Sequence, residues 1–169
     1  YVASRALVAA SVYRYLQAYG QDEASLARVG QALTLSMAAV LMSQRDDGGW
    51  GWNVNLLRDT ETGTPAVVKM QSNPYMTAQS LEALLEMKAA GLPVPPDAVS
   101  RALDSLATTM DSDGLWDISA ISFWEGKSDK VKLGTAAEIF KVMAYAGVVF
   151  PDATYSAYGY QNAMTKLGP

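Results

Sequence analysis

The feature that most constrains the fold of this chain is a helical unit that occurs three times. Each copy has a helix-forming segment ending at a glycine, a short turn with an aspartate, and a second helix-forming segment. The glycines and aspartates are Gly20, Gly91 and Gly147, and Asp22, Asp97 and Asp152. Apolar residues recur three and four positions apart in these segments, which indicates helices with one buried face. Repeats of this length are typical of arrays in which each hairpin packs only against its neighbours.

The repeat predicts an all-α fold, an array of about three α/α-hairpins at residues 1–44, 75–110 and 134–167. We expect six principal helices, and no more β-structure than a short ribbon within residues 54–72. The terminal glycines predict left-handed helix ends, because glycine adopts a positive φ without steric cost. Asp97 is expected to cap a fourth helix over residues 98–110, and Gly147 to close a fifth over residues 135–146.

Composition restricts the functions open to the chain. Half of its 169 residues are hydrophobic and 18% are charged, as in globular proteins. The net charge of -4 argues against a nucleic-acid partner, since such binding requires Lys and Arg at phosphates. With no cysteine and no histidine, thiol nucleophiles, Cys/His zinc sites and histidine triads are excluded. We expect no enzymatic activity, no metal and no cofactor. The apolar stretches are shorter than the roughly 20 residues of a membrane span, so none is expected.

One short motif stands at the end of each of the first two predicted hairpins. The first copy reads Gln-x-x-Asp-Gly-x-Trp and consists of Gln44, Asp47, Gly48 and Trp50. The second copy consists of Asp113, Gly114 and Trp116, with Met110 in place of the glutamine. Glycine allows the reversed backbone, aspartate accepts from turn amides, and tryptophan covers the hairpin end while offering an N–H donor. We interpret the motif as structural; the alternative is carboxylate catalysis at Asp46 or Asp47.

Aromatic residues gather in the loops that follow the hairpins. Beyond the motif tryptophans these are Trp52, Tyr75, Phe123 and Trp124. They form a candidate binding surface for a peptide or a carbohydrate. The alternative is that they cover the ends of the helices, which is the commoner use of such side chains.

The turn motif resembles the repeat of α/α-toroid proteins, a group that includes triterpene cyclases, protein prenyltransferases and the thioester domains of α2-macroglobulin-like proteins. The cyclases carry an acidic D-x-D-D run, which this chain lacks. The chain also lacks the Cys and His zinc ligands of the prenyltransferases. Bacterial α2-macroglobulin thioester domains are the most similar, because several of their motifs occur here in order. These are the turn at residues 47–52, the stretch at 73–78, the helix end at 88–91 and a Pro-Val turn.

The resemblance implies a partial α/α toroid, with residues 1–169 as a single domain fragment. It implies part of a protease inhibitor in the periplasm or outside the cell, whose partners are neighbouring macroglobulin domains and target proteases. The alternative is a non-covalent protein or ligand binding module of α/α-toroid type.

The family's thioester joins a Cys and a Gln just before a Ser-Arg pair that opens a helix. Ser4-Arg5 matches that pair, which places Tyr1 where the Gln is expected. We therefore expect no working thioester; the alternative is a sequence that begins inside the motif.

Overall fold

The fold is all-α, as the repeat predicts. The computed structural model describes residues 2–20, 22–51, 56–58, 65–67, 72–111, 114–116 and 129–151. Five helices lie in these ranges: α1 (Val2–Tyr19), α2 (Glu23–Met42), α3 (Pro74–Ala89), α4 (Pro96–Thr109) and α5 (Asp129–Val149). Strands β1 (Leu56–Arg58) and β2 (Pro65–Val67) form an antiparallel ribbon, in register through Leu56 and Val67. The ribbon falls within the range in which one was expected.

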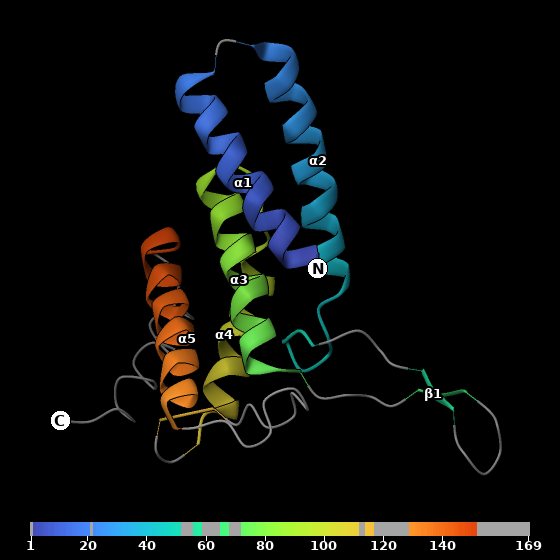
Figure 1. The fold of residues 1–169 in the computed structure, drawn as a ribbon, viewed down its shortest axis with the longest axis vertical. Helices are drawn as coiled ribbons and strands as arrows, with labels where there is room; N and C mark the ends of the chain where they lie inside the picture. The colour runs from blue at the N-terminus through green and yellow to red at the C-terminus, as the bar shows by residue number, and fades with distance from the viewer. Residues whose placement is uncertain are drawn as a thin grey trace.

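The helices are arranged as a hairpin array in which α3 is central (Figure 1). Helices α1, α3 and α5 lie side by side, while α2 packs on α1 and α4 packs on α3. Side-chain contacts show that α1 and α3 run in the same direction, because Arg14 pairs with Glu86 and Gln17 donates to the carbonyl of Ala90. Helices α3 and α5 also run in the same direction, because Glu82 pairs with Lys141 and Lys88 lies over Phe150 just after α5. The first helix of each unit therefore lies parallel to that of the next.

Two of the helix starts follow from their capping residues, and a third corrects a prediction. Asp22 caps α2 by accepting from the amide of Ala24, and Asn73 caps α3 by accepting from that of Met76. Asp97, the expected cap of the fourth helix, lies inside its first turn. Helix α4 begins two residues earlier than predicted because its cap is Pro95 and the fixed φ of Pro96 suits a first helical position.

Helices α1 and α3 end at Gly20 and Gly91 as the sequence predicts, but only Gly91 has the left-handed conformation. Gly91 has φ +91°, and the amides of Gly91 and Leu92 donate to the carbonyls of Lys88 and Met87, which is a Schellman end. Gly20 does not have a positive φ; its amide donates to Leu16 and so continues the helical pattern. The predicted end of the first helix at Gly20 is confirmed, because α1 ends at Tyr19, but the left-handed conformation expected of Gly20 is wrong. The prediction for Gly147 is wrong in both respects.

Gly147 lies inside α5, which begins before Gly134 and continues to Val149. Glycine costs a helix interior only about 1 kcal/mol, so it does not end a helix by itself. The buried face of α5, made of Ile139, Val142, Met143 and Ala146, supplies the packing that outweighs this cost. The predicted sixth helix at residues 152–167, with its capping Asp152, lies outside the described residues.

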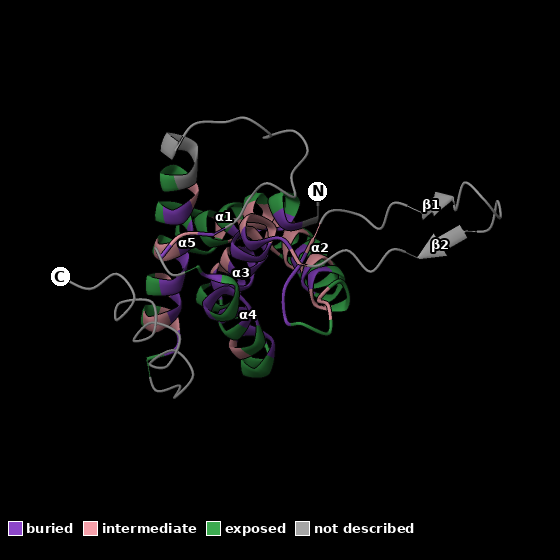
Figure 2. Cartoon of the chain, turned by 90° about the horizontal axis from the view of Figure 1, so that it is seen from below, coloured by how far each residue is buried: buried purple, intermediate pink, exposed green. Residues whose placement is uncertain are grey.

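The hydrophobic core surrounds α3 (Figure 2). Helix α3 contributes Leu81, Leu84, Leu85 and Met87, all fully buried. Against them lie Leu103 and Leu106 of α4, and the buried face of α5. Helix α1 reaches the core through the small residues Ala3, Ala6 and Ala10, which permit close approach of the helices.

Helix α2 is strongly apolar, although most of its residues are not buried in the array. Among the described helices it alone is long and apolar enough to cross a membrane by length and composition, with 20 residues and a mean hydropathy of 1.3. The expectation that no segment reaches that threshold was too strict, because the interrupting polar residues are few and uncharged over most of α2. Only Leu33, Met37 and Val40 of this helix are buried.

Candidate functional site

The first motif forms a tight turn directly after α2. The amide of Arg45 donates to the carbonyl of Gly49 over 2.9 Å, and that of Gly48 donates back to Arg45 over 3.0 Å. Gly48 has φ +84°, the conformation that glycine tolerates best. The Gln44 amide group donates to the carbonyls of Gly48 and Ala98, each over 2.8 Å, and so joins the turn to α4.

The Asp47 carboxylate holds the loop that leads into α3. Its Oδ1 accepts from the amide of Gly49 and from the hydroxyl of Ser72, and its Oδ2 accepts from the amide of Ser72. Burial acts to raise the pKa of Asp47, but the hydrogen bonds from Ser72 and Gly49 outweigh it, so the pKa is lowered. A carboxylate stabilised in its charged form by three donors is a poor general base.

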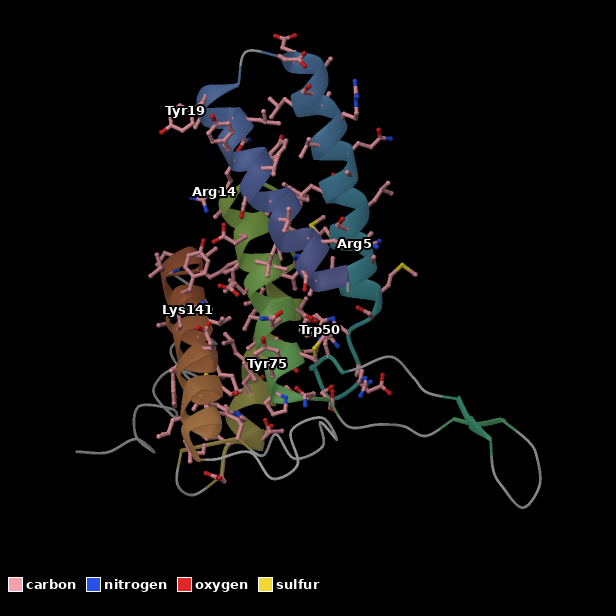
Figure 3. The ribbon with its side chains drawn as sticks, viewed as in Figure 1. Arg5, Arg14, Tyr19, Trp50, Tyr75 and Lys141 are labelled. Atoms are coloured by element: carbon pink, nitrogen blue, oxygen red, sulfur yellow. The ribbon has the colours of Figure 1, made fainter. Side chains whose placement is uncertain are left out.

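Trp50 connects α2 to α3 and is only 3% exposed. Its indole Nε1 donates to the carbonyl of Val40 over 2.8 Å, ten residues earlier in α2. Its amide donates to the hydroxyl of Thr77, and its carbonyl accepts from the amide of Asn73. Trp50 therefore fastens the second helix of one hairpin to the first helix of the next (Figure 3).

The second motif repeats this geometry between α4 and α5. The amide of Asp111 donates to the carbonyl of Leu115, and that of Gly114, with φ +75°, donates back to Asp111. The indole Nε1 of Trp116 donates to the carbonyl of Leu106, again ten residues earlier and over 2.8 Å. Its ring packs edge-on against Phe140 of α5, with centroids 5.1 Å apart. The two turns therefore share one pattern of backbone and indole hydrogen bonds.

Asp111 of the second motif accepts from the amide of Leu115, and Asp113 lies outside the described part of the chain. Sequence reasoning missed several residues around the first turn. Ser72 and Thr77 have no motif that could have marked them. Asn73 could have been found, because an Asn before a Pro and an apolar run is a helix-start signal.

The candidate aromatic surface is only partly visible in the structure. Tyr75 is half-buried in the first turn of α3, and its hydroxyl accepts from the side chain of Gln79. Trp52, Phe123 and Trp124 lie outside the described residues, so the structure does not bring the four together.

Charged groups bridge the row formed by α1, α3 and α5. Arg14 and Glu86 pair at 2.6 Å, and the hydrogen bond to Glu86 raises the pKa of Arg14. Lys141 reaches both Glu82 at 3.2 Å and Glu138 at 2.6 Å. Both cations are about half exposed, so these pairs align helices and add little stability. Within the described ranges, no three His, Cys, Asp or Glu residues are grouped so that they could hold a metal.

No protein-family model matches this chain, and neither a curated protein nor a solved structure matches it. The resemblance to the thioester domains therefore rests on the sequence motifs alone.

The lowered pKa of Asp47 predicts a loss of stability in acid. A carboxylate with a depressed folded-state pKa stabilises the fold above its unfolded value of 3.8, and this contribution disappears as the pH falls through the lower folded value. Thermal melts of the protein and of Asp47→Asn should therefore differ most at about pH 7, and the difference should shrink as the pH falls below 3.8. A difference that is equally large at both ends of this range would show that the charge of Asp47 contributes nothing.

Proposed function

We propose that this chain is a non-catalytic helical domain of an α2-macroglobulin-like protease inhibitor that acts in the periplasm or outside the cell. In this role it packs against neighbouring macroglobulin domains, and it is displaced when a target protease cuts the bait segment. The proposal includes no working thioester, because Tyr1, which lies outside the described residues, stands where the family's Gln is expected. Inhibition then depends on shape change and steric trapping.

The observation that carries this proposal is the repeated turn. Trp50 and Trp116 each donate to a carbonyl ten residues earlier and each connect one hairpin to the next. Such an internal repeat, with parallel first helices, supports a partial α/α toroid. The hydrogen bonds of the turns are internal, which supports a structural role for the motif in holding the hairpins together.

Inhibition can be measured with a general endopeptidase and two substrates, a large protein and a short chromogenic peptide. The protein that carries this chain is expected to suppress cleavage of the large substrate and to spare that of the peptide, because a trapped protease still admits small molecules. Treatment with methylamine, which opens thioesters, is expected to leave the inhibition unchanged. Equal cleavage of the large substrate with and without the protein would refute the inhibitor role. Loss of inhibition with methylamine, together with release of a thiol, would refute only the absence of a thioester.

A further inference from the structure

Helices α1 and α2 form one edge of the array, and α5 lies at the other edge (Figure 2). Their outer surface, the α1–α2 face, is apolar: Val8 is 65% exposed, Val12 43% and Leu35 66%. An open groove between the two helices is lined by Val8, Val12, Val29 and Ala32. A continuous apolar surface of this kind indicates a face that another element covers. Comparison with the next hairpin of the repeat shows which kind of element fits.

The first helices of the three units can be compared residue by residue, counting back from the glycine of each unit. These glycines are Gly20, Gly91 and Gly147. At the position of Val12 in α1, helix α3 has Ala83 and helix α5 has Ile139. Ala83 and Ile139 are fully buried, whereas Val12 is exposed. The first unit therefore exposes a position that the next two units bury.

The side of α3 that carries Ala83 is the side that receives α1. Glu86, which lies one turn after Ala83, accepts from Arg14 of α1 over 2.6 Å. The carbonyl of Ala90, one further turn along, accepts from Gln17 of α1. Helix α3 thus meets the preceding first helix on this side, and α5 packs on α3 with its own buried face. In α1 the same side is the outer one, and it belongs to the α1–α2 face.

The second helices show the same difference when they are aligned by the two Asp-Gly turns. Ala32 and Leu35 of α2 then correspond to Ala98 and Arg101 of α4. In α4 these two residues meet the turn of the preceding hairpin. The carbonyl of Ala98 accepts from the side chain of Gln44 over 2.8 Å, and Arg101 donates to the side-chain oxygen of Gln44. In α2 both Ala32 and Leu35 are exposed.

We propose that the α1–α2 face receives one more hairpin of the same repeat, formed by the protein's own chain ahead of Tyr1. The first helix of that hairpin lies parallel to α1 along Val8 and Val12, and the turn at its end lies on Ala32 and Leu35. This continues the two interfaces that the array already contains, since hairpins of a repeat pack on their neighbours in one way. The proposal rests on the repeat and not on the inhibitor role, so either can fail alone.

The face also specifies the chemistry of the added hairpin. Val12 is larger than Ala83, its counterpart in α3, so the helix that packs on it must present small side chains there. Arg5 and Arg28 lie beside the groove. We therefore expect acidic side chains opposite these two arginines, because complementary charges fix the register of such a contact.

Labelling of introduced cysteines with N-ethylmaleimide tests the proposal in the full-length protein that carries this chain. Val12→Cys should label at least about 100-fold more slowly than Met42→Cys, because a cysteine covered by packed helices reacts only when the structure opens. Met42 is the matched control, since it is 88% exposed and its counterpart in α4, Thr108, is exposed although a hairpin precedes α4. Mass spectrometry of the labelled peptides measures both rates. Equal rates overturn the proposal.

Photo-cross-linking then identifies what covers the face. Tyr15 lies at its rim, because Glu86, at the same position of α3, is half-buried, so a benzophenone maleimide can be attached to Tyr15→Cys. The cross-link should join residue 15 to the same molecule's chain ahead of Tyr1, within a stretch no longer than that from Val2 to Asn73. A cross-link to a second copy, to a more distant segment or to the lipid of added phosphatidylcholine–phosphatidylglycerol vesicles overturns the proposal.

Discussion

Trp50→Ala is expected to lower the free energy of unfolding by about 3–5 kcal/mol, the usual cost of removing a buried large aromatic side chain. Its ring is 3% exposed, and its indole N–H is the donor to the carbonyl of Val40. Removal would leave a cavity between α2 and α3 and take one donor from the carbonyl of Val40, which still accepts from the hydroxyl of Ser43. Urea unfolding, followed by circular dichroism, measures the change.

Two further variants make this result specific. Trp50→Phe keeps most of the ring volume and removes the N–H, so it should cost less than the alanine variant and carries the test if Trp50→Ala does not fold. Tyr19→Ala removes a ring that is 75% exposed, and we expect a change within about 0.5 kcal/mol. An unfolding curve of Trp50→Ala that coincides with that of Tyr19→Ala would mean that Trp50 is a surface residue, available for binding.

Gly48→Ala is expected to destabilise the fold by about 2–5 kcal/mol. Its φ of +84° costs an L-residue about 1–2 kcal/mol. A Cβ atom there would also collide with the backbone carbonyl of Arg101 in α4, and such overpacking adds about 1–3 kcal/mol. The same urea titration measures the loss.

Gly91→Ala separates these two causes. Gly91 has nearly the same backbone conformation, with φ +91°, but a Cβ atom there would meet nothing within 4 Å. It should therefore cost only the conformational part, about 1–2 kcal/mol. If both variants lose the same stability, the turn does not press against α4, and Gly48 is needed for its conformation alone.

The helices could be predicted from the sequence because their apolar spacing and their local start signals agree. Asp22 and Asn73 cap the helices that follow them, as their residue types favour, and Gly91 ends helix α3. Where local signals conflict with packing, packing decides. Gly147 is a strong stop signal in the sequence, yet the buried side of α5 carries the helix past it. Helix α4 is capped by Pro95 and not by Asp97 as expected, because proline at the first helical position, here Pro96, also favours a helix start.

The turns could be predicted in part. The spacing of Asp, Gly and Trp identified Asp47, Gly48 and Trp50 as members of one turn. The partners of the tryptophans could not be predicted, because they depend on how the helices pack. The Trp50 indole donates to Val40 of α2, the Trp50 backbone amide donates to Thr77 of α3, and the Trp116 ring packs on Phe140 of α5.

Our central claim is that the two Asp-Gly turns hold neighbouring hairpins together through buried hydrogen bonds. Proton exchange of the tryptophan indole N–H groups, followed by NMR with Trp→Phe variants for assignment, tests this claim most directly. We expect the indole protons of Trp50 and Trp116 to be strongly protected and to exchange only when the array opens, because both donate to buried helix carbonyls over 2.8 Å. Exchange of either proton at the rate of a solvent-exposed indole would contradict it.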